Sequence, residues 1–293
     1  MRSAEAIREM SDGRFDITVY PGDELVAAPE LADALASGLI DFTITAGSYY
    51  KGAIPEMMLE PTGWPPLIVR SPEDQAELMW YRGLNDLIDK ALNKYGIKYF
   101  FPDVEGPTAF WSKEPMYGVD DLKGFKMRLW GRFIDAFNAV GASAVYLPHS
   151  EVYTAIATGV LDGGGGLGTF YMDMNFRELC PYYYDRALNA PSVSYMASLD
   201  SWNELPDAFK VMLEEECLAN RQKVYNATMH DSYVMKGKFK EWGTTVITWP
   251  DEELNKICAA SIKILDEMAA AGPVNAEGMQ IVKDFLKERG YMD

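Results

Sequence analysis

Residues 119–131, VDDLKGFKMRLWG, and residues 141–166, GASAVYLPHSEVYTAIATGVLDGGGG, are the most informative part of this chain of 293 residues. The first stretch places the guanidinium of Arg128 at the end of a short predicted strand. The second predicts a helix from Ser150 to Gly159, with Ser150 as its N-cap, followed by a turn of four glycines. Because glycine has no Cβ, the backbone there could approach a small molecule closely. The pattern indicates a site that holds an anion rather than one that transforms it.

The charge balance of the chain argues against one large class of function. The sequence has 27 Lys and Arg against 44 Asp and Glu, a formal net charge of −17. Nucleic-acid binding depends on neutralising phosphates with basic side chains, so no nucleic-acid partner is expected. An anionic ligand needs a local positive site against this background, which makes Arg128 conspicuous. Aromatic residues make up 13% of the chain, a content that suits a lined ligand cavity.

No metal, cofactor or membrane-spanning segment is predicted. Cys180, Cys217 and Cys258 are widely spaced without a CxxC pair, which argues against a thiolate zinc site. Cys217 and Cys258 lie in helical patterns and are expected to be small buried side chains, although a disulfide between them is left open. His149 and His230 lie far apart without metal-ligand spacing. His149 precedes the helix from Ser150 and could touch the ligand, but a surface cap region is expected. No run of 18 apolar residues occurs.

Alternating strands and helices organise the chain. Strands are expected at residues 15–19, 41–45, 98–102, 107–113, 126–130, 192–198 and 246–248. Helices are expected at residues 25–37, 72–95, 132–140, 150–159, 170–179, 207–242, 250–271 and 276–288. This order predicts an α/β fold with largely parallel sheets. A chain of this length exceeds the size at which a single hydrophobic core usually stops growing, so two lobes are expected.

Four segments in order resemble one protein family. They are GRFDITVYPGDELVAAPELADALASGLIDFTIT at residues 13–45, VDDLKGFKMRLWG at 119–131, VGASAVYLPHSEVYTAIATGVLDG at 140–163 and DSWNELPDAFKVMLEE at 200–215. Together they resemble the extracytoplasmic solute-binding subunits of TRAP transporters, of the DctP type. The resemblance covers nearly the whole chain.

The resemblance implies a two-lobe fold with hinge strands and a long connecting helix, which closes around a small organic acid. It implies lobe 1 at residues 1–112, lobe 2 at 113–200, the connecting helix at 201–242 and C-terminal helices at 243–293. It also implies that Arg128 pairs with the ligand carboxylate, since a guanidinium meets a carboxylate bidentately. The resemblance implies that the protein works in the periplasm as a monomer or a homodimer. Its implied partners are the membrane subunits of a TRAP transporter.

Three departures from the family pattern shape the expected site. Gly165 and Gly166 fall where the α-keto acid and lactate-type members carry carboxylate and Trp side chains that help to hold a metal and the ligand, so a metal-bridged ligand is not expected and the cavity should be wider. Alternatively, the glycines simply make a turn and a neighbouring side chain takes the missing role. Pro107 and Thr108 are neutral where sialic-acid-binding members carry a second cation, which argues against such a ligand. The first strand of lobe 1 is expected to be missing, because the family pattern begins before residue 1, as in a truncated gene model or fragment.

Aromatic residues supply the other expected ligand contacts. Trp130 follows Arg128 by two residues and could stack on an apolar ligand body. Of Phe110 and Trp111, one should face the cleft by strand alternation, and Phe110 is preferred. The remaining expected contacts follow strand ends, adjoin the glycines or lie within a lobe 2 strand: Tyr49, Tyr50, Gly165, Phe170, Tyr171 and Tyr195. One cation within aromatic walls predicts a monocarboxylate with a bulky apolar or ring-bearing body.

Other functions compete with ligand delivery. An enzyme on a similar two-lobe scaffold would need a nucleophile–base pair or a metal cluster. The sequence has no GxSxG, HExxH, P-loop or dinucleotide fingerprint, so no catalytic residue is assigned. A metabolite sensor or carrier that works without a transporter remains an alternative.

Overall fold

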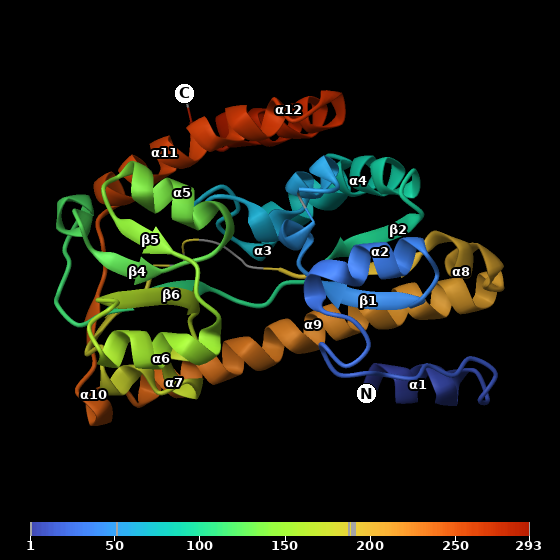
Figure 1. Ribbon diagram of the computed structural model, residues 1–293, viewed down its shortest axis with the longest axis horizontal. Coiled ribbons are helices and arrows are strands. Elements are labelled where there is room, and N and C mark those ends of the chain that lie inside the picture. The colour runs from blue at the N-terminus through green and yellow to red at the C-terminus, as the bar shows by residue number, and fades with distance from the viewer. Residues whose placement is uncertain (1, 51, 187, 189–191, 293) are drawn as a thin grey trace.

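Two β-sheets organise the chain, and each forms the centre of one lobe (Figure 1). The computed structural model describes residues 2–50, 52–186, 188 and 192–292. The sheet of lobe 1 has the strand order β1-β8-β2, formed by Phe42–Thr45, Ser194–Ser198 and Ile97–Pro102. The sheet of lobe 2 has the order β5-β4-β6-β3-β7-β9, formed by Ser143–Val145, Lys126–Arg128, Gly163–Leu167, Thr108–Ser112, Tyr182–Tyr184 and Thr245–Ile247. The α/β class and the two-lobe architecture are as predicted.

The helices cover both faces of the sheets. They are α1 (Arg2–Met10), α2 (Leu31–Ala36), α3 (Pro72–Ala76), α4 (Leu84–Asn93), α5 (Gly131–Ala139), α6 (His149–Ala157), α7 (Phe170–Asp173), α8 (Leu199–Glu204), α9 (Asp207–Gly237), α10 (Phe239–Trp242), α11 (Asp251–Ala269) and α12 (Pro273–Glu288). The long helix α9 runs along both lobes, while α11 packs on α5 of lobe 2 and α12 on α4 of lobe 1 (Figure 1). No helix within the described ranges is long and apolar enough to cross a bilayer.

One strand in each sheet runs against its neighbours. Strand β3 is antiparallel to β6 and β7, and β8 is antiparallel to β1 and β2. The expectation of largely parallel sheets is therefore wrong. Each antiparallel strand is the one that follows directly from the other lobe, since β3 comes after β2 of lobe 1 and β8 comes after β7 of lobe 2. The expected boundaries at residues 112 and 200 do not follow the sheets either, since β3 belongs to the lobe 2 sheet and β8 to the lobe 1 sheet.

The glycines at 163–166 form a strand and not the predicted turn. They lie in β6, which is buried between β4 and β3. A Cβ on Gly165 would come within 2.8 Å of Leu129 Cδ2, and one on Gly166 within 3.1 Å of Phe170 Cδ2. Neighbouring side chains therefore fill the space that larger residues would occupy, and the glycines do not widen a cavity.

The structure also corrects the strand expected at residues 15–19 and the helix expected at residues 72–95. Residues 15–19 alternate as predicted but pair with no described strand; Phe15 instead stacks on Phe209 of α9, with ring centroids 5.2 Å apart. The helix expected at residues 72–95 is interrupted by a π-helical turn at Glu77–Tyr81 and by Gly83, whose φ is +74°. All three cysteines are free and buried, so the possible disulfide does not form.

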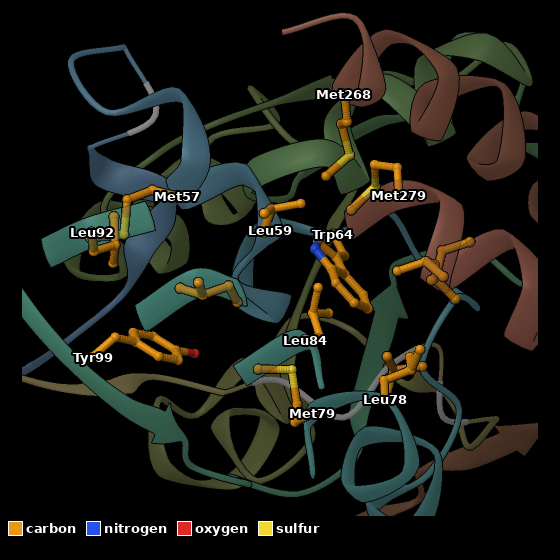
Figure 2. Close-up of a cluster of buried hydrophobic side chains, with 14 of the residues drawn as sticks. Met57, Leu59, Trp64, Leu78, Met79, Leu84, Leu92, Tyr99, Met268 and Met279 are labelled. Atoms are coloured by element: carbon orange, nitrogen blue, oxygen red, sulfur yellow. The ribbon is translucent and has the colours of Figure 1, made fainter. Parts of the chain in front are cut away.

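Apolar cores fill both faces of each sheet. In lobe 1, the core beneath α4 and α12 brings together Trp64, Leu84, Met268 and Met279, each at most 1% exposed (Figure 2). In lobe 2, one core lies toward α5 and α11 and the other toward α6 and α7. Because these side chains interlock within each lobe, the lobes form stable bodies that the connecting segments can move relative to one another.

Candidate ligand-binding site

Arg128 lies at the carboxyl end of β4, held by backbone from both neighbouring strands. Its Nε donates to the carbonyl oxygen of Leu147 at 3.0 Å, just after β5, and its Nη1 donates to that of Gly165 in β6 at 3.2 Å. The side chain is only 3% exposed, and this burial lowers the pKa of Arg128 to about 10. Among the described residues no carboxylate forms an ion pair with it. A buried cation without a counter-ion is costly, so this site favours an anion.

Aromatic rings surround the guanidinium. The centroids of Trp130 and Tyr146 lie 5.8 and 5.6 Å from Arg128 Cζ, within cation–π range. Tyr49 comes from lobe 1, where it ends the 3-10 turn Gly47–Tyr49 that follows β1. Burial and the nearby Tyr146 raise the pKa of Tyr49, while the charge of Arg128 acts in the opposite direction. The site thus draws side chains from both lobes.

His149 is a neighbour of Arg128 that the sequence interpretation placed at the surface. It is the first residue of α6, and its Nε2 is buried without a hydrogen-bond partner in the described structure. Its ring packs edge-on against Phe170, with centroids 4.7 Å apart. Burial and the charge of Arg128 lower the pKa of His149 to about 4, so the imidazole is neutral at pH 7. The helix has Pro148 as its N-cap, not Ser150 as predicted.

Glu105 is a second residue that sequence analysis missed. It lies in the segment 103–107 that joins β2 to β3, and it acts on the pKa of Tyr49. Burial, and then the charge of Asp103, raise the pKa of Glu105 to about 7. Both His149 and Glu105 adjoin strand ends at the boundary between lobes, where open α/β sheets place ligands, and that position was the available signal.

Of the residues expected to contact ligand, five lie around the guanidinium and four do not. Arg128, Trp130, Gly165, Phe170 and Tyr49 are the five, with Phe170 joined to the group through His149. The other four are Phe110, Tyr50, Tyr171 and Tyr195, each at most 3% exposed, and their role as ligand contacts stays a prediction.

These four residues make contacts within the protein. Phe110 stacks on Tyr184 with centroids 4.1 Å apart, inside the lobe 2 core, because β3 is buried on both faces. The hydroxyl of Tyr50 donates to the carbonyl oxygen of Ala28 at 2.9 Å. The hydroxyl of Tyr171 donates to the carbonyl oxygen of Cys180 at 2.7 Å. The hydroxyl of Tyr195 donates to the carboxylate of Asp103 at 3.1 Å. Tyr195 also lies in the lobe 1 sheet and not in lobe 2.

In the described part of the chain, no three His, Cys, Asp or Glu side chains gather as a metal site would require. A buried cation, a neutral imidazole and aromatic rings at the boundary of two lobes instead define a two-lobe solute-binding protein.

Comparisons with known proteins identify the family. The model of bacterial extracellular solute-binding protein family 7, DctP, matches residues 2–271, and the chain belongs to this family. The family comprises the extracytoplasmic solute-binding proteins of TRAP transporters, which bind solutes and are not enzymes. The resemblance seen in the sequence motifs is therefore confirmed.

Individual relatives agree in fold across nearly the whole chain. A monocarboxylate 2-oxoacid-binding periplasmic protein of Nostoc sp. is 24% identical over 293 residues, which is 97% of this chain and 79% of the relative. A TRAP periplasmic solute-binding protein of Rhodobacter sphaeroides, solved in an open form without ligand, is 26% identical with a TM-score of 0.83 and covers 99% of this chain and 93% of its own. One from Colwellia psychrerythraea, with bound calcium and pyruvate, is 27% identical with a TM-score of 0.83, at 99% and 89% coverage.

Proposed function

We propose that this protein binds a small organic monocarboxylate with a bulky apolar or ring-bearing body and delivers it to the membrane subunits of a TRAP transporter in the periplasm. The observation that carries the proposal is the buried guanidinium of Arg128, whose described hydrogen-bond acceptors are two backbone carbonyls. These carbonyls fix the orientation of the guanidinium and leave Nη2 free of any described partner. A ligand carboxylate supplies the missing negative charge.

The carboxylate gains more at this site than in water. Charge-assisted hydrogen bonds to a guanidinium are short and strong, and burial reduces the competition from solvent. His149 is neutral and therefore does not add a second charge, but its Nε2 is close enough to Arg128 to experience its field. We place this nitrogen against the ligand, where it gains the hydrogen bond that the protein does not give it.

The aromatic residues receive the body of the ligand. Trp130 is held by stacking on Phe133, with centroids 4.3 Å apart, while Tyr49 and Tyr146 are about half exposed at 52% and 54%. Exposed rings of this size lose water when an apolar ligand body covers them, which favours binding. The names of two relatives, which mention a 2-oxoacid and pyruvate, support the acid class.

Binding is coupled to closure of the lobes. Tyr49 belongs to lobe 1 and Arg128 to lobe 2, so a ligand that touches both stabilises the closed arrangement. The closed form then presents a distinct surface to the membrane subunits. A monomer or a homodimer can act in this way, and no metal or cofactor takes part in the proposed binding step.

Calorimetry with three probes tests the role of Arg128. The probes are pyruvate, 4-methyl-2-oxopentanoate and phenylpyruvate, and native mass spectrometry of the purified protein identifies any co-purified acid. We expect Arg128→Ala to weaken binding at least 100-fold, about 2.8 kcal/mol. Arg132→Ala is the matched control, because it removes the same charge from α5, where Arg132 pairs with Asp135 at 2.9 Å.

Two outcomes would contradict the proposal. One is an Arg128→Ala protein that retains its circular dichroism spectrum and its affinity for the acid. The other is a co-purified ligand without a carboxylate. If binding disappears with chelator or in sodium-free buffer, only the proposal that no metal takes part in binding is contradicted.

A further inference from the structure

We infer that Glu60 is a positioning residue of the binding site: while protonated, its carboxyl group holds the turn that carries Tyr49 against the segment that crosses between the lobes, and ligand affinity falls when this group ionises. The inference rests on the proposed function, because Tyr49 must receive the ligand body for the position of its turn to matter. Glu60 does not contact the ligand and acts through the residues that it holds.

The carboxyl group of Glu60 joins three segments that lie far apart in the sequence. Glu60 is 0% exposed and comes directly before the turn Pro61–Gly63. A Cβ on Gly47 would lie 3.0 Å from Glu60 Cβ and 3.1 Å from its Oε2, so the turn that ends at Tyr49 packs directly on this side chain. The hydroxyl of Ser194 in β8 donates to Oε1 at 2.8 Å. One buried group therefore connects the Tyr49 turn to the lobe 1 sheet.

The turn that follows Glu60 is packed between the two lobes beside the binding site. A Cβ on Gly63 would lie 3.2 Å from Ser48 Cβ, so this turn contacts the residue before Tyr49. A Cβ on Gly131 would lie 3.7 Å from Gly63 Cα, which brings the same turn to the residue after Trp130. Movement of the turn therefore shifts aromatic rings that are available to the ligand body in both lobes.

A proton on Glu60 completes a chain of hydrogen bonds to the crossing segment. Thr62 Oγ1 lies 2.6 Å from Glu60 Oε1 and 2.5 Å from the carbonyl oxygen of Ser192, which lies between β7 and β8. A protonated Glu60 donates to Thr62, and the hydroxyl of Thr62 can then donate to Ser192. An ionised Glu60 takes the proton of Thr62 for itself, so Ser192 loses this donor. Ionisation therefore loosens the connection between the Tyr49 turn and the segment that crosses from lobe 2 to lobe 1.

The surroundings of Glu60 give it no counter-ion. No ion pair joins Glu60 to another residue that the structure describes. The titratable group that faces it is Tyr99 of β2, whose hydroxyl oxygen lies 3.1 Å from that of Ser194; burial and the charge of Glu60 raise the pKa of Tyr99, so the phenol stays neutral. The other titratable side chains of the turns and strands packed against Glu60 are exposed or bonded elsewhere: Tyr49, Tyr50, Glu56, Lys98 and Tyr195.

Ligand affinity should fall as the pH rises through 7. Burial raises the pKa of Glu60 to about 7 from 4.5, while hydrogen bonds from Thr62, Ser194 and Gly47 act in the opposite direction. If binding requires the protonated form of a group with this pKa, affinity falls about ten-fold between pH 6 and 8, and binding above pH 7 takes up a proton.

The dependence of affinity on pH tests the inference. Affinities for pyruvate, 4-methyl-2-oxopentanoate and phenylpyruvate are measured by calorimetry on the full chain at pH 6, 7 and 8, in two buffers of different ionisation enthalpy. We expect the wild-type protein to lose about ten-fold in affinity over this range, with proton uptake. Glu60→Gln keeps a neutral side chain of the same shape and should bind equally well at pH 6 and 8. Glu56→Gln is the matched control, because this carboxylate lies in the preceding turn and pairs with Lys94 at 2.5 Å, and it should keep the wild-type profile.

Amide hydrogen exchange of the ligand-free protein examines the same arrangement without a ligand. After correction for intrinsic exchange rates, residues 47–50 and 192–194 should lose protection between pH 6 and 8 in the wild-type protein, because ionisation of Glu60 loosens both segments. Glu60→Gln should keep their protection constant, with circular dichroism confirming that the variant folds.

The outcomes separate this inference from the proposed function. If Glu60→Gln shows the same fall in affinity as the wild type, or if the wild-type affinity is constant or rises from pH 6 to 8, the inference is wrong and the function stands. If none of the three probes binds, hydrogen exchange decides, and equal pH dependence of the two segments in both proteins overturns the inference. If Arg128→Ala retains full affinity, the proposed function fails first.

Discussion

At the scale of single residues, the sequence pointed to Arg128 and to three aromatic residues that lie around its guanidinium, Trp130, Tyr49 and Phe170, but not to Tyr146. Arg128 was identified by its place in the KMR motif at a strand end, which is a local property. Both faces of β3 are buried, so alternation along this strand cannot indicate which face meets a ligand, and the role of Phe110 stays a prediction. Tyr195 was expected in a strand of lobe 2, but its strand β8 belongs to the lobe 1 sheet.

The imidazole of His149 should titrate abnormally. Burial and the charge of Arg128 depress its pKa to about 4 from 6.5. We expect its NMR signals to stay in the neutral form down to pH 5, and Arg128→Ala to move the pKa part of the way back, because one of its two causes is removed.

The same shift has a consequence for stability. His149 binds a proton more readily in the unfolded chain than in the folded chain. Protonation of this residue therefore favours unfolding as the pH falls from 6.5 toward 4. His149→Asn should flatten that part of the stability profile. A His149 that titrates near 6.5 in the folded protein would refute the assignment of its environment.

At the scale of elements, β6 shows why glycines stand in a buried strand. A Cβ on Gly163 would overlap the carbonyl oxygen of Trp111 and lie 3.0 Å from Phe125 Cζ. At Gly164, the nearest atom to a Cβ would be Trp111 Nε1 at 3.4 Å, an ordinary contact. We expect Gly163→Ala to destabilise the protein by about 3 kcal/mol, as overpacking against backbone does, and Gly164→Ala by less than about 1 kcal/mol.

Urea denaturation of the two variants checks this difference. Because both changes add one methyl group to the same strand, strand propensity cancels in the comparison. Equal stability of the two variants would mean that β6 does not have the neighbours described here.

A buried carboxyl group, Glu60, ties the turn at Pro61–Gly63 to strand β8. Its oxygens accept from the backbone N–H of Thr62 at 3.1 Å and from the hydroxyl of Ser194 at 2.8 Å. Thr62 Oγ1 lies 2.6 Å from Glu60 Oε1 and 2.5 Å from the carbonyl oxygen of Ser192, but its single proton can serve only one of them. A protonated Glu60 resolves this conflict by donating to Thr62, which agrees with its pKa, raised by burial to about 7.

Stability should therefore depend on the ionisation of Glu60. Its folded pKa of about 7 exceeds the ordinary value of 4.5, so the stability it contributes is present below pH 4.5 and is lost as the pH rises through 7. This loss in the free energy of unfolding amounts to at most about 3 kcal/mol. Glu60→Gln should remove it, so that denaturation midpoints measured from pH 5 to 8 fall less than those of the wild type; parallel profiles would contradict a protonated Glu60.

The elements themselves were largely predictable, but their pairing was not. The expected strands at 41–45, 98–102 and 107–113 agree with β1, β2 and β3, because local apolar patterns mark them. Strand direction depends on which lobe the chain has just left, and that is a tertiary property. The glycines of β6 resemble a turn in sequence because their partners, such as Leu129 and Phe170, become neighbours only after folding.

At the scale of the whole molecule, a hydrogen-bond network joins the segments that cross between lobes. Asn220 of α9 donates to the hydroxyl of Tyr195 in β8 at 2.9 Å, and that hydroxyl donates to Asp103 after β2. The backbone N–H of Asp103 also donates to the carbonyl oxygen of Val193 at 2.6 Å. The long helix and both crossing segments thus meet at one point, from which the lobes can move as bodies.

Removal of the Tyr195 hydroxyl should loosen this junction. Tyr195→Phe leaves Asp103 buried with one donor fewer, which should cost about 1–3 kcal/mol and increase amide hydrogen exchange in residues 103–107 and 192–194. Tyr153→Phe is the control, because its exposed hydroxyl donates to Glu178 within lobe 2. If Tyr195→Phe matches the control in stability and in exchange at both segments, the network does not couple the lobes, and ligand closure must depend on the contacts of Tyr49 with the site around Arg128.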